Sequence, residues 1–449
     1  MTEHYDVFCL GGGTAGNAAT RALADAGKTV AVAEPARVGG TCLWHGCIPK
    51  KALYHSASAY RELRQAEDWG VVPGTVAVDW PGVLAWKWHV QETYAGDQEG
   101  IMASHGITRI DAPARFVAEN AVEADGVTYE AERFIIATGS VATRPPIPGA
   151  DLADTSDDAL RYPELPRSLV IVGAGYIGLE FAGIFASFGT RVTVVNHAPE
   201  ILAPFDPDTV AVARAALEEL GVRFVLDTSV AEISGVTGDL TVALRPSDGA
   251  PYSVTAERVV LATGRKPALD DLGLEHAGVD RDEHGRPVLD ASLASTNPRI
   301  YVVGDAAGRE MHTPVASLHG RSVAQTILTD TPVAVDASSI PFTCFTVPQL
   351  AQVGLTAERA RQLGIPHTTK TGSFEYVAAA IITDTRQGLI KLVVAEDGSL
   401  LGAHIAHDAA SDLIYPFALA LRAGLDVGTI AATPAIHPAL TEAVTWSVG

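Results

Sequence analysis

Basic residues are in short supply in this sequence. Its 449 residues include 32 lysines and arginines against 53 aspartates and glutamates, which gives a formal net charge of −21. Such a charge argues against a nucleic acid or an anionic membrane surface as a partner. No apolar run reaches the roughly 18 residues that a membrane span needs, and residues 1–4 do not begin an export signal. We therefore expect a cytoplasmic protein with no membrane or nucleic-acid partner.

Cysteine is also scarce. Four cysteines in a chain of this length do not make the disulfide framework of a secreted domain. Cys9 and Cys344 are isolated in apolar stretches and are expected to be plain buried residues, so no zinc site or other metal site is expected. Cys42 and Cys47 differ from them, because a close pair in a cytosolic chain indicates catalysis, redox sensing or metal binding.

The sequence does contain a glycine-rich loop within a complete strand–helix–strand pattern. Residues 5–10 indicate a buried strand, a helix extends to about Gly27, and residues 29–33 form a second strand that ends at Glu34. The glycines of the loop are Gly11, Gly13 and Gly16. They permit a tight turn, close approach of the backbone to a pyrophosphate and close helix–sheet packing. This predicts a dinucleotide site, with Glu34 at the ribose diol and the helix N-terminus at the phosphates.

The same pattern recurs in the middle of the chain. A strand at residues 169–172 leads into Gly173, Gly175 and Gly178, a helix extends to about Phe188, and residues 191–195 form a strand that ends at Asn196. Two such units indicate two dinucleotides, or one dinucleotide and a degenerate copy. An electron-transfer enzyme, which needs a donor and a carrier, fits the first alternative.

The chain then changes character. Apolar strands at 134–139 and 259–264 each end in Ala-Thr-Gly, and a proline-rich stretch at 144–149 indicates a linker. After the turn-rich residues 329–332 there is no nucleotide loop. Instead, strands at 353–355 and 389–394 and a helix at 411–423 are expected. The predicted fold is α/β, with two Rossmann-like dinucleotide-binding domains and a C-terminal α+β domain.

A disulfide between Cys42 and Cys47 would require a break in the helix. Pro49 suits a first helical turn, and residues 50–63 are helix formers, which places Cys47 near a helix N-terminus where a thiolate is stabilised. Cα atoms five residues apart in a regular helix lie about 8–9 Å from each other, whereas a disulfide tolerates about 4.4–6.8 Å. If Cys42 and Cys47 bond, the chain between them must leave α geometry, and Gly46 would help it to do so.

Taken together, these motifs resemble the flavin-dependent pyridine nucleotide-disulfide oxidoreductases, such as glutathione reductase, dihydrolipoyl dehydrogenase and mercuric reductase. The resemblance covers essentially the whole chain in order. The motifs that carry it are the two glycine loops, the block 40–49 around the cysteines, the two Ala-Thr-Gly strands, residues 301–305 and residues 435–442. The domains that it implies are 1–145 for FAD, 146–264 for NAD(P), 265–332 returning to the FAD domain, and 333–449 for dimerisation.

The resemblance also implies the cofactor positions. Gly11, Gly13, Gly16 and Glu34 would hold the adenosine half of FAD, Asp305 would bond the ribityl chain, and Thr138 and Gly139 would line the site. Lys50 or Lys51 would lie near the flavin and pair with Glu180, and both positions stay open. Tyr176 would cover the nicotinamide pocket. The remaining implied cofactor positions are Thr41, Gly173, Gly175, Gly178, Asn196, Gly264 and Gly304.

Four residues would carry the chemistry that the resemblance implies. Cys47 would face the flavin and give a charge-transfer band, and Cys42 would attack the substrate disulfide. His437 would act as general acid–base, with Glu442 orienting its imidazole. In relatives this histidine reaches the active site of the other subunit, so the resemblance implies an obligate homodimer with shared active sites.

The sequence departs from the family pattern in the redox loop and in the second nucleotide site. Trp44 and His45 replace the usual Asn-Val of the redox loop, which means either local repacking or altered thiol chemistry and substrate access. Asn196 stands where NADH-using relatives have an acid, and no arginine or lysine follows before Arg214 to bind a 2′-phosphate. The lack of a basic partner for a 2′-phosphate favours NADH over NADPH as the electron donor.

The range of possible substrates is narrowed by substrate-binding residues of relatives that are missing from this chain. Arg21 falls at a position where glutathione reductases grip carboxylates, but Thr326 replaces a second expected arginine, and residues 446–449 have no extra cysteine pair of the mercuric reductase kind. We predict an FAD-dependent NAD(P)H:disulfide oxidoreductase that acts on a small disulfide through Cys42 and Cys47. The alternatives are a dihydrolipoyl dehydrogenase, disfavoured by Lys50 in place of the usual serine, and a non-catalytic flavoprotein sensor, disfavoured by the retained Cys42, Cys47, His437 and Glu442.

Overall fold

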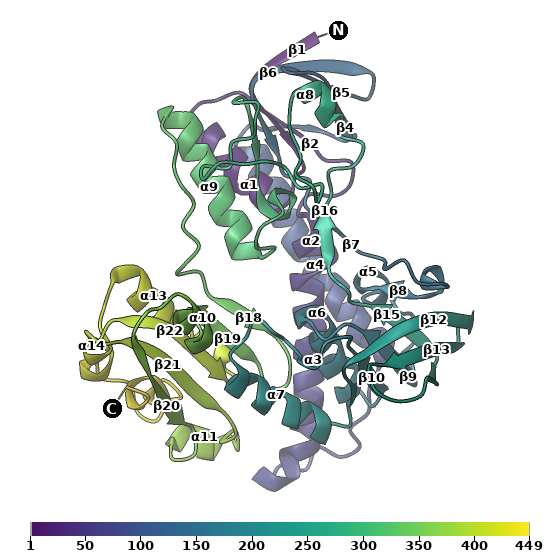
Figure 1. Ribbon diagram of the computed structural model, residues 1–449, viewed down its shortest axis with the longest axis vertical. Helices are drawn as coiled ribbons and strands as arrows, with labels where there is room; N and C mark the ends of the chain where they lie inside the picture. The colour runs from purple at the N-terminus through teal and green to yellow at the C-terminus, as the bar shows by residue number, and fades with distance from the viewer. Residues whose placement is uncertain (1, 449) are drawn as a thin grey trace. The chain divides into compact units, whose positions relative to one another are not determined.

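The computed structural model describes residues 2–448, which divide into two compact units. The first comprises the chain up to Ala52, Leu84–Thr143 and Gly264–Ala337. The second comprises Leu53–Val83, Arg144–Thr263 and the chain from Ser338 onward. Each unit is therefore built from segments that are distant in the sequence (Figure 1).

A parallel sheet forms the centre of the first unit, with a small antiparallel extension. Its strands, in spatial order, are β3 (Thr108–Ile110), β2 (Val30–Ala33), β1 (Thr2–Leu10), β6 (Val127–Ile136) and β17 (Ile300–Val302), with β5 (Ala121–Ala124) and β4 (Ala114–Ala118) antiparallel beside the first half of β6. Helix α1 (Thr14–Asp25) connects β1 to β2. Because the order reverses between β1 and β6, the carboxyl end of β1 is the topological switch point, where doubly wound sheets bind their ligands.

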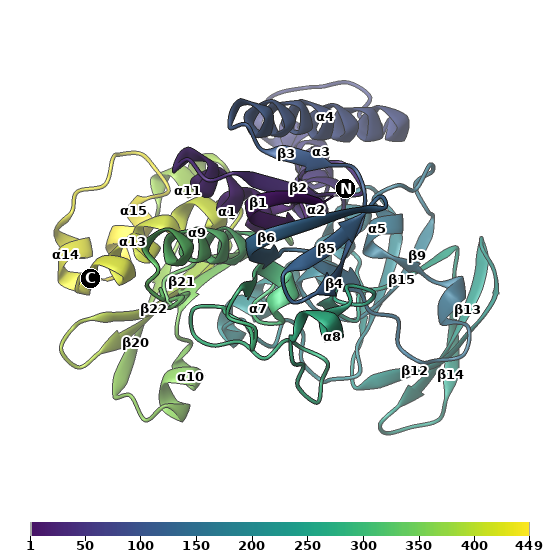
Figure 2. The same ribbon diagram turned by 90° about the horizontal axis from the view of Figure 1, so that it is seen from above.

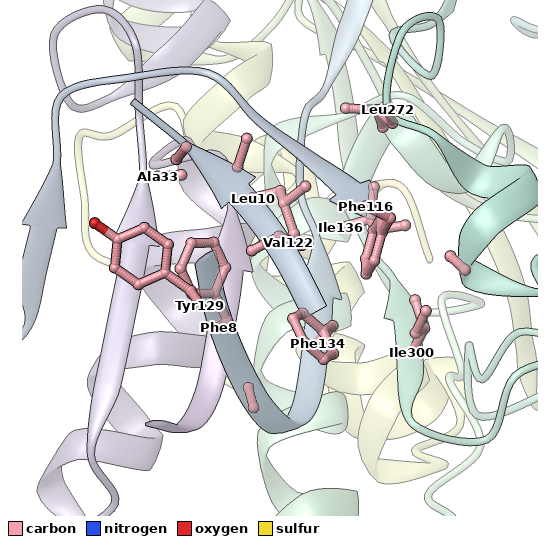
Figure 3. Packing of buried hydrophobic residues seen from close by; sticks show 14 of the residues in the cluster. Phe8, Leu10, Ala33, Phe116, Val122, Tyr129, Phe134, Ile136, Leu272 and Ile300 are labelled. Atoms are coloured by element: carbon pink, nitrogen blue, oxygen red, sulfur yellow. The ribbon is translucent and has the colours of Figure 1, made fainter. Parts of the chain in front are cut away.

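The two faces of this sheet are both apolar, as a covered parallel sheet requires. Phe8 and Leu10 of β1 pack with Phe116, Phe134 and Ile300 in one buried cluster, which Figure 3 shows from close by. The rings of Phe116 and Phe134 meet edge to face, with centroids 5.2 Å apart. The alternate residues of β1, Val7 and Cys9, belong to the cluster on the other face.

Helix α9 (Thr313–Thr329) packs against α1 on that other face (Figure 2). The two backbones approach closely, because a Cβ at Gly320 would lie 2.3 Å from the carbonyl oxygen of Ala15. This contact fixes the N-terminal part of α9, and with it Thr313, relative to the first glycine loop.

The second unit contains another parallel sheet with the same pattern. Its strands, in spatial order, are β11 (Arg223–Val225), β10 (Arg191–Val195), β9 (Ser168–Val172), β15 (Arg258–Leu261) and β8 (Asp154–Thr155), accompanied by the antiparallel strands β12 (Thr228–Val236), β13 (Asp239–Pro246) and β14 (Tyr252–Ala256). Helix α6 (Tyr176–Ser187) connects β9 to β10. The predicted repeat of the dinucleotide-binding fold is confirmed.

The C-terminal part of the second unit is an antiparallel sheet with helices, which confirms the predicted α+β type. Its spatial order is β18 (Phe342–Cys344), β19 (Leu350–Gly354), β22 (Leu400–Ala406), β21 (Leu389–Ala395) and β20 (His367–Ser373). The helix predicted over 411–423 is two helices, α12 (Ala410–Leu413) and α13 (Tyr415–Ala423). The reason is Pro416, which lacks an amide hydrogen and is placed in the first turn of α13.

The remaining elements complete the chain. They are α2 (Gly40–Trp44), α3 (Cys47–Gln65), η1 (Ala66–Trp69), α4 (Trp80–Ser104), β7 (Ser140–Ala142), η2 (Ala150–Leu152), α5 (Ser156–Ala159), α7 (Pro207–Glu219), β16 (Arg265–Pro267), α8 (Leu274–Ala277), η3 (Gly304–Ala307), α10 (Ala357–Gln362), α11 (Ala378–Ile382), α14 (Val427–Ala432) and α15 (Glu442–Trp446). Among residues 2–448, no helix combines the length and apolar character that crossing a bilayer demands.

Candidate active site

The first glycine loop has no room for a side chain at Gly11 or Gly16. Gly11 has a φ of +109°, and a Cβ on it would lie 2.4 Å from the carbonyl oxygen of Ala137. A Cβ on Gly16 would lie 2.1 Å from the carbonyl oxygen of Gly11. Gly13 caps the N-terminus of α1 in an extended conformation. The loop can therefore bring bare backbone amides close to a pyrophosphate at the switch point.

Glu34 lies beside this loop at the end of β2. One carboxylate oxygen accepts the amide hydrogen of Gly12 at 2.8 Å, and the other accepts that of Ala36 at 3.0 Å. The side chain is buried. Because each carboxylate oxygen has more than one acceptor site, both can still accept a hydroxyl. These residues fit the adenosine ribose of a dinucleotide such as FAD.

A polar cluster follows β17 in the same unit. The hydroxyl of Ser140 donates to a carboxylate oxygen of Asp305 at 2.6 Å, and Arg265 Nε donates to the Ser140 hydroxyl at 2.8 Å. The hydroxyl of Thr138 donates to the carbonyl of Ala268 at 2.7 Å. Asp305 is therefore oriented by neighbours and keeps acceptor capacity, as a ligand to the hydroxyls of a ribityl chain would need.

The glycines near this cluster have positive φ angles, a backbone conformation that favours glycine. Gly139 has a φ of +74° and Gly304 a φ of +62°. Gly264 has a φ of +113°, and its carbonyl accepts hydrogen bonds from both the amide and the hydroxyl of Thr143. These glycines thus shape the loops around Asp305.

A buried histidine supports the turn before Asp305. The amide of Gly304 donates to Nδ1 of His319 at 3.1 Å, and the His319 side chain is 1% exposed. Burial, followed by the nearby positive charge of Arg309, lowers the pKa of His319 to about 4. His319 is consequently a neutral hydrogen-bond acceptor at ordinary pH.

The cysteine pair spans a break between two helices. Helix α2 ends at Trp44, His45 leaves helical geometry with φ −137° and ψ 11°, and α3 begins at Cys47. The chain therefore leaves α geometry between the two cysteines, which is the condition that a bond between them would require. Thr41 lies in α2 next to Cys42, and its carbonyl accepts the amide hydrogen of His45 at 2.9 Å.

Both cysteines carry thiols, and two threonine hydroxyls contact them. Cys47 is exposed, and its sulfur lies 3.1 Å from the hydroxyl of Thr313. The thiol of Cys42 hydrogen-bonds to Cys47, and this bond, followed by burial, raises the pKa of Cys42. Hydrogen bonds from Thr313 and Thr14 act in the opposite direction. The Cys42 thiol therefore keeps its proton more firmly than an ordinary cysteine does.

The second glycine loop reproduces the geometry of the first. A Cβ on Gly173 would lie 2.4 Å from the carbonyl oxygen of Ala262, and one on Gly178 would lie 2.2 Å from that of Gly173. Gly175 caps α6 as Gly13 caps α1. The loop can therefore accept a second pyrophosphate.

Asn196 takes the structural position that Glu34 has in the first loop. Its Oδ1 accepts the amide hydrogen of Ala174 at 3.2 Å, as Glu34 accepts that of Gly12. Its amide nitrogen donates to the carbonyls of Ala198 at 3.1 Å and Glu200 at 2.8 Å. Both amide hydrogens are thus committed to the loop after β10, which makes this side chain a poorer ribose ligand than a carboxylate.

Strand β18 and the residue after it support the start of α6. The ring of Tyr176 meets that of Phe342 edge to face at 5.5 Å, and the thiol of Cys344 lies 3.8 Å from the Tyr176 carbonyl. The amide of Phe345 donates to Glu180 at 2.7 Å. Tyr176 and Glu180 are therefore both oriented by one short segment of the C-terminal sheet.

The two predicted lysines differ in exposure. Lys50 is buried and Lys51 is half-buried, both in the first turns of α3. Glu180 is also buried. Pairing of one of these lysines with Glu180 stays a prediction.

His437 and Glu442 form a dyad near the C-terminus. Nδ1 of His437 lies 3.0 Å from one carboxylate oxygen of Glu442, and the other accepts the amide hydrogen of Ala439 at 3.2 Å. The hydrogen bond with His437 lowers the pKa of Glu442. The His437 side chain is 70% exposed. A carboxylate therefore orients an imidazole that faces outward from the chain.

The C-terminal segment that carries this dyad is fixed to β20. Lys370 Nζ donates to the carbonyl of Val448 at 2.7 Å, and a Cβ on Gly372 would lie 2.8 Å from Cβ of Ser447. This anchoring limits the movement of Glu442.

Several residues of the site have no signal in the sequence. Thr14, Ser140, Thr313, His319 and Phe342 stand in no distinctive motif, and their partners Cys42, Asp305, Cys47, Gly304 and Tyr176 lie 15 to 266 residues away in the chain. By contrast, Cys9 and Cys344 are buried as expected. Within the described part of the chain, there is no cluster of three or more side chains suited to holding a metal ion.

Comparison with known proteins agrees with this geometry. Residues 5–320 match the profile described as pyridine nucleotide-disulphide oxidoreductase, and residues 340–448 match its dimerisation domain. The chain is 32% identical over 464 residues to dihydrolipoyl dehydrogenase 3 of Haloarcula marismortui, which covers 99% of this chain and 96% of that protein. It is 31% identical over 439 residues to a glutathione reductase of Burkholderia cepacia, which covers 98% and 97%.

A solved structure is similar over the same extent. It is a Cu(II) complex of the HOCl-induced flavoprotein disulfide reductase RclA from Escherichia coli, with a TM-score of 0.89, 28% sequence identity and 99% of each chain covered. From the two dinucleotide folds, the thiol pair and these matches, we conclude that the chain belongs to the pyridine nucleotide-disulphide oxidoreductase family and is an FAD-dependent enzyme that uses a pyridine nucleotide.

Proposed function

We propose that this enzyme transfers electrons from NADH to a small disulfide through Cys42 and Cys47. The observation that carries the proposal is the contact between the two thiols, at the start of α3 and within reach of the Thr313 hydroxyl. FAD, when bound, accepts a hydride from the nicotinamide and passes electron pairs to the disulfide. Gly11, Gly16, Glu34 and Asp305 are the residues that would hold it.

Cys42 is the exchange thiol in this proposal. It must lose its proton to attack, because the thiolate is the nucleophile. Its raised pKa therefore calls for a base, and His437 supplies one. The Cys42 thiolate attacks one sulfur of the substrate, and the first product thiol leaves with a proton from His437.

Cys47 completes the exchange. Its sulfur attacks the mixed disulfide at Cys42, which releases the second product thiol and leaves the Cys42–Cys47 disulfide. Two electrons and two protons have then passed from the cysteine pair to the substrate. Contact with the hydroxyl of Thr313 supports the anionic form of Cys47 during this step.

We also propose that His437 acts in the active site of a second copy of the chain. The exposure of the His437–Glu442 dyad and the match of residues 340–448 to a dimerisation domain support this arrangement. Glu442 would hold the imidazole in the tautomer whose other nitrogen faces the substrate. The functional unit would then be a homodimer with two shared active sites.

The second glycine loop supports NADH as the donor. A 2′-phosphate would need cationic partners, but residues 192–213 include no lysine or arginine. The amide hydrogens of Asn196 are already committed to Ala198 and Glu200. We expect NADH to be preferred, though by less than in a relative with a carboxylate at this position.

A small disulfide other than glutathione disulfide fits the remaining residues best. Arg21 already donates to Gln98, and Thr326 is buried and accepts the amide hydrogen of Val333. A second candidate is dihydrolipoamide oxidation, because one of the most similar relatives is named dihydrolipoyl dehydrogenase. Lys50 disfavours dihydrolipoamide oxidation, since a serine is usual at that position in dihydrolipoyl dehydrogenases.

Two experiments test the proposal. Anaerobic addition of one equivalent of NADH should produce a long-wavelength absorbance band in the holoenzyme, and Cys47→Ser should abolish it. Bleaching of the flavin without this band would refute the role of the cysteine pair. A steady-state panel of lipoamide, glutathione disulfide and other small disulfides, each with NADH and NADPH, should show turnover with a small disulfide and NADH. Turnover with lipoamide alone would favour the second candidate.

A further inference from the structure

The helix that carries Cys42 is too short to be stable by itself. Helix α2 has five residues, whereas isolated helices below about 12–15 residues are marginal in water. It begins after Gly39, whose φ is +115°, and ends at a non-helical His45. The position of the exchange thiol must therefore depend on contacts from outside α2.

The first external contact is made by Gln91 of α4. Its side-chain nitrogen donates to the carbonyls of Leu43 at 2.9 Å and Trp44 at 3.3 Å. These are two of the carbonyls that the end of a helix leaves without a helical partner. The Gln91 side chain is 1% exposed, so water does not compete for these bonds.

The second external contact fixes the side chain of Trp44, the last residue of α2. Its indole nitrogen donates to the carbonyl of Val38 at 3.0 Å. The guanidinium of Arg37 lies 4.3 Å from the centroid of the Trp44 ring, and Arg37 donates to Glu92 at 2.6 Å. Glu92 follows Gln91 directly on α4, so adjacent residues of one helix secure both the backbone and the ring.

We propose that Gln91, Trp44 and Arg37 are positioning residues that keep Cys42 within bonding reach of Cys47 and thereby set the reduction potential of the pair. This inference rests on the proposed function, because it takes Cys42 and Cys47 as the redox couple. It also assigns a role to Trp44, a residue that stands where an asparagine is usual in relatives.

The physical effect is on the effective concentration of one thiol toward the other. Reduction of the Cys42–Cys47 disulfide breaks the S–S bond, takes two electrons and two protons, and gives two thiols. Holding Cys42 close to Cys47 favours the closed disulfide. Releasing α2 lowers that effective concentration, so the disulfide becomes easier to reduce.

The experiment measures the equilibrium between the enzyme disulfide and dithiothreitol, which supplies both electrons and both protons and closes to its cyclic disulfide. Holoenzyme is equilibrated in dithiothreitol buffers, quenched with acid and labelled with a maleimide polymer, and the labelled fraction is read from a gel shift. Trp44→Ala and Gln91→Met should each shift the equilibrium toward the dithiol about tenfold, which is about 30 mV for a two-electron couple.

Two further variants separate positioning from general stability. Trp44→Phe keeps a ring for Arg37 but loses the bond to Val38, so a smaller shift in the same direction is expected. Trp86→Ala is the matched control, because Trp86 is an exposed tryptophan on α4 outside these contacts. Its equilibrium should equal that of the wild type.

The outcomes are distinguishable. The inference is overturned if folded Gln91→Met and Trp44→Phe proteins stay within twofold of wild type, or if Trp86→Ala shifts as much as they do. If Trp44→Ala does not fold, those two milder variants decide. A wild-type enzyme that shows no dithiothreitol-reducible pair would instead refute the proposed function itself.

Discussion

The buried histidine beneath Gly304 should make the stability of this enzyme depend on pH. His319 is 1% exposed and accepts the Gly304 amide hydrogen, and its pKa is lowered to about 4. An exposed histidine in the unfolded chain titrates near 6.5. Between these values the unfolded state binds the extra proton and the folded state does not, so the free energy of unfolding falls as the pH falls. From pH 7 to pH 5 the loss amounts to about 2 kcal/mol.

The variant His319→Gln isolates this effect. The glutamine oxygen can still accept the amide hydrogen of Gly304, but the side chain does not titrate. Urea unfolding of holoenzyme at pH 7 and pH 5 should therefore show about 2 kcal/mol less pH dependence in the variant than in the wild type. If both proteins lose the same stability over this range, His319 is not a neutral acceptor in the folded state and the reasoning fails.

Three other substitutions probe the site. Thr313→Val removes the hydrogen bond to Cys47, which is worth about 1.5–3 kcal/mol if the sulfur is charged. The pH at which the charge-transfer band titrates should therefore rise by about 1–2 units, and Thr313→Ser should bring it back to the wild-type value. Glu442→Gln should lower kcat/KM for the disulfide by about a hundredfold through His437, while stopped-flow reduction by NADH stays unchanged; equal losses in both steps would contradict the assigned role. Gly16→Ala places a Cβ 2.1 Å from a carbonyl oxygen and should reduce bound FAD, measured as the ratio of flavin to protein absorbance, and full occupancy would contradict the tight fit of this loop.

How much of the site the sequence could predict depends on the range of the interactions. The turn at Gly11 and Gly16 and the helix start at Cys47 were predictable because the glycine spacing and Pro49 mark them within a few residues, although the contact that confines Gly11 is with the distant Ala137. Thr313 was not, since its contact with Cys47 spans 266 residues and a threonine before a proline has many other uses.

The same limit applies to the fold. The βαβ units follow from local periodicity, and so does the α+β character of the C-terminal part. The contact of Phe342 with Tyr176 could not be predicted in this way, because Phe342 lies in β18, which comes much later in the chain. The division of the helix predicted over 411–423 was visible in principle at Pro416, whose position in a first turn marks a new helix start.

The interrupted sequence of the first unit has a consequence for synthesis of the chain. Strand β17 pairs with β6 through Val302 and Ile136, which are 166 residues apart. Chains are synthesised at roughly 5–20 residues per second, so one edge of β6 stays without this neighbour for about 8–33 s. During that time the segment with the second glycine loop emerges from the ribosome. A nascent chain with an open apolar strand edge is a substrate for chaperones and a site of mispairing. Slower elongation before residue 300 would lengthen that exposure, and fusion partners placed at the C-terminus would not shorten it.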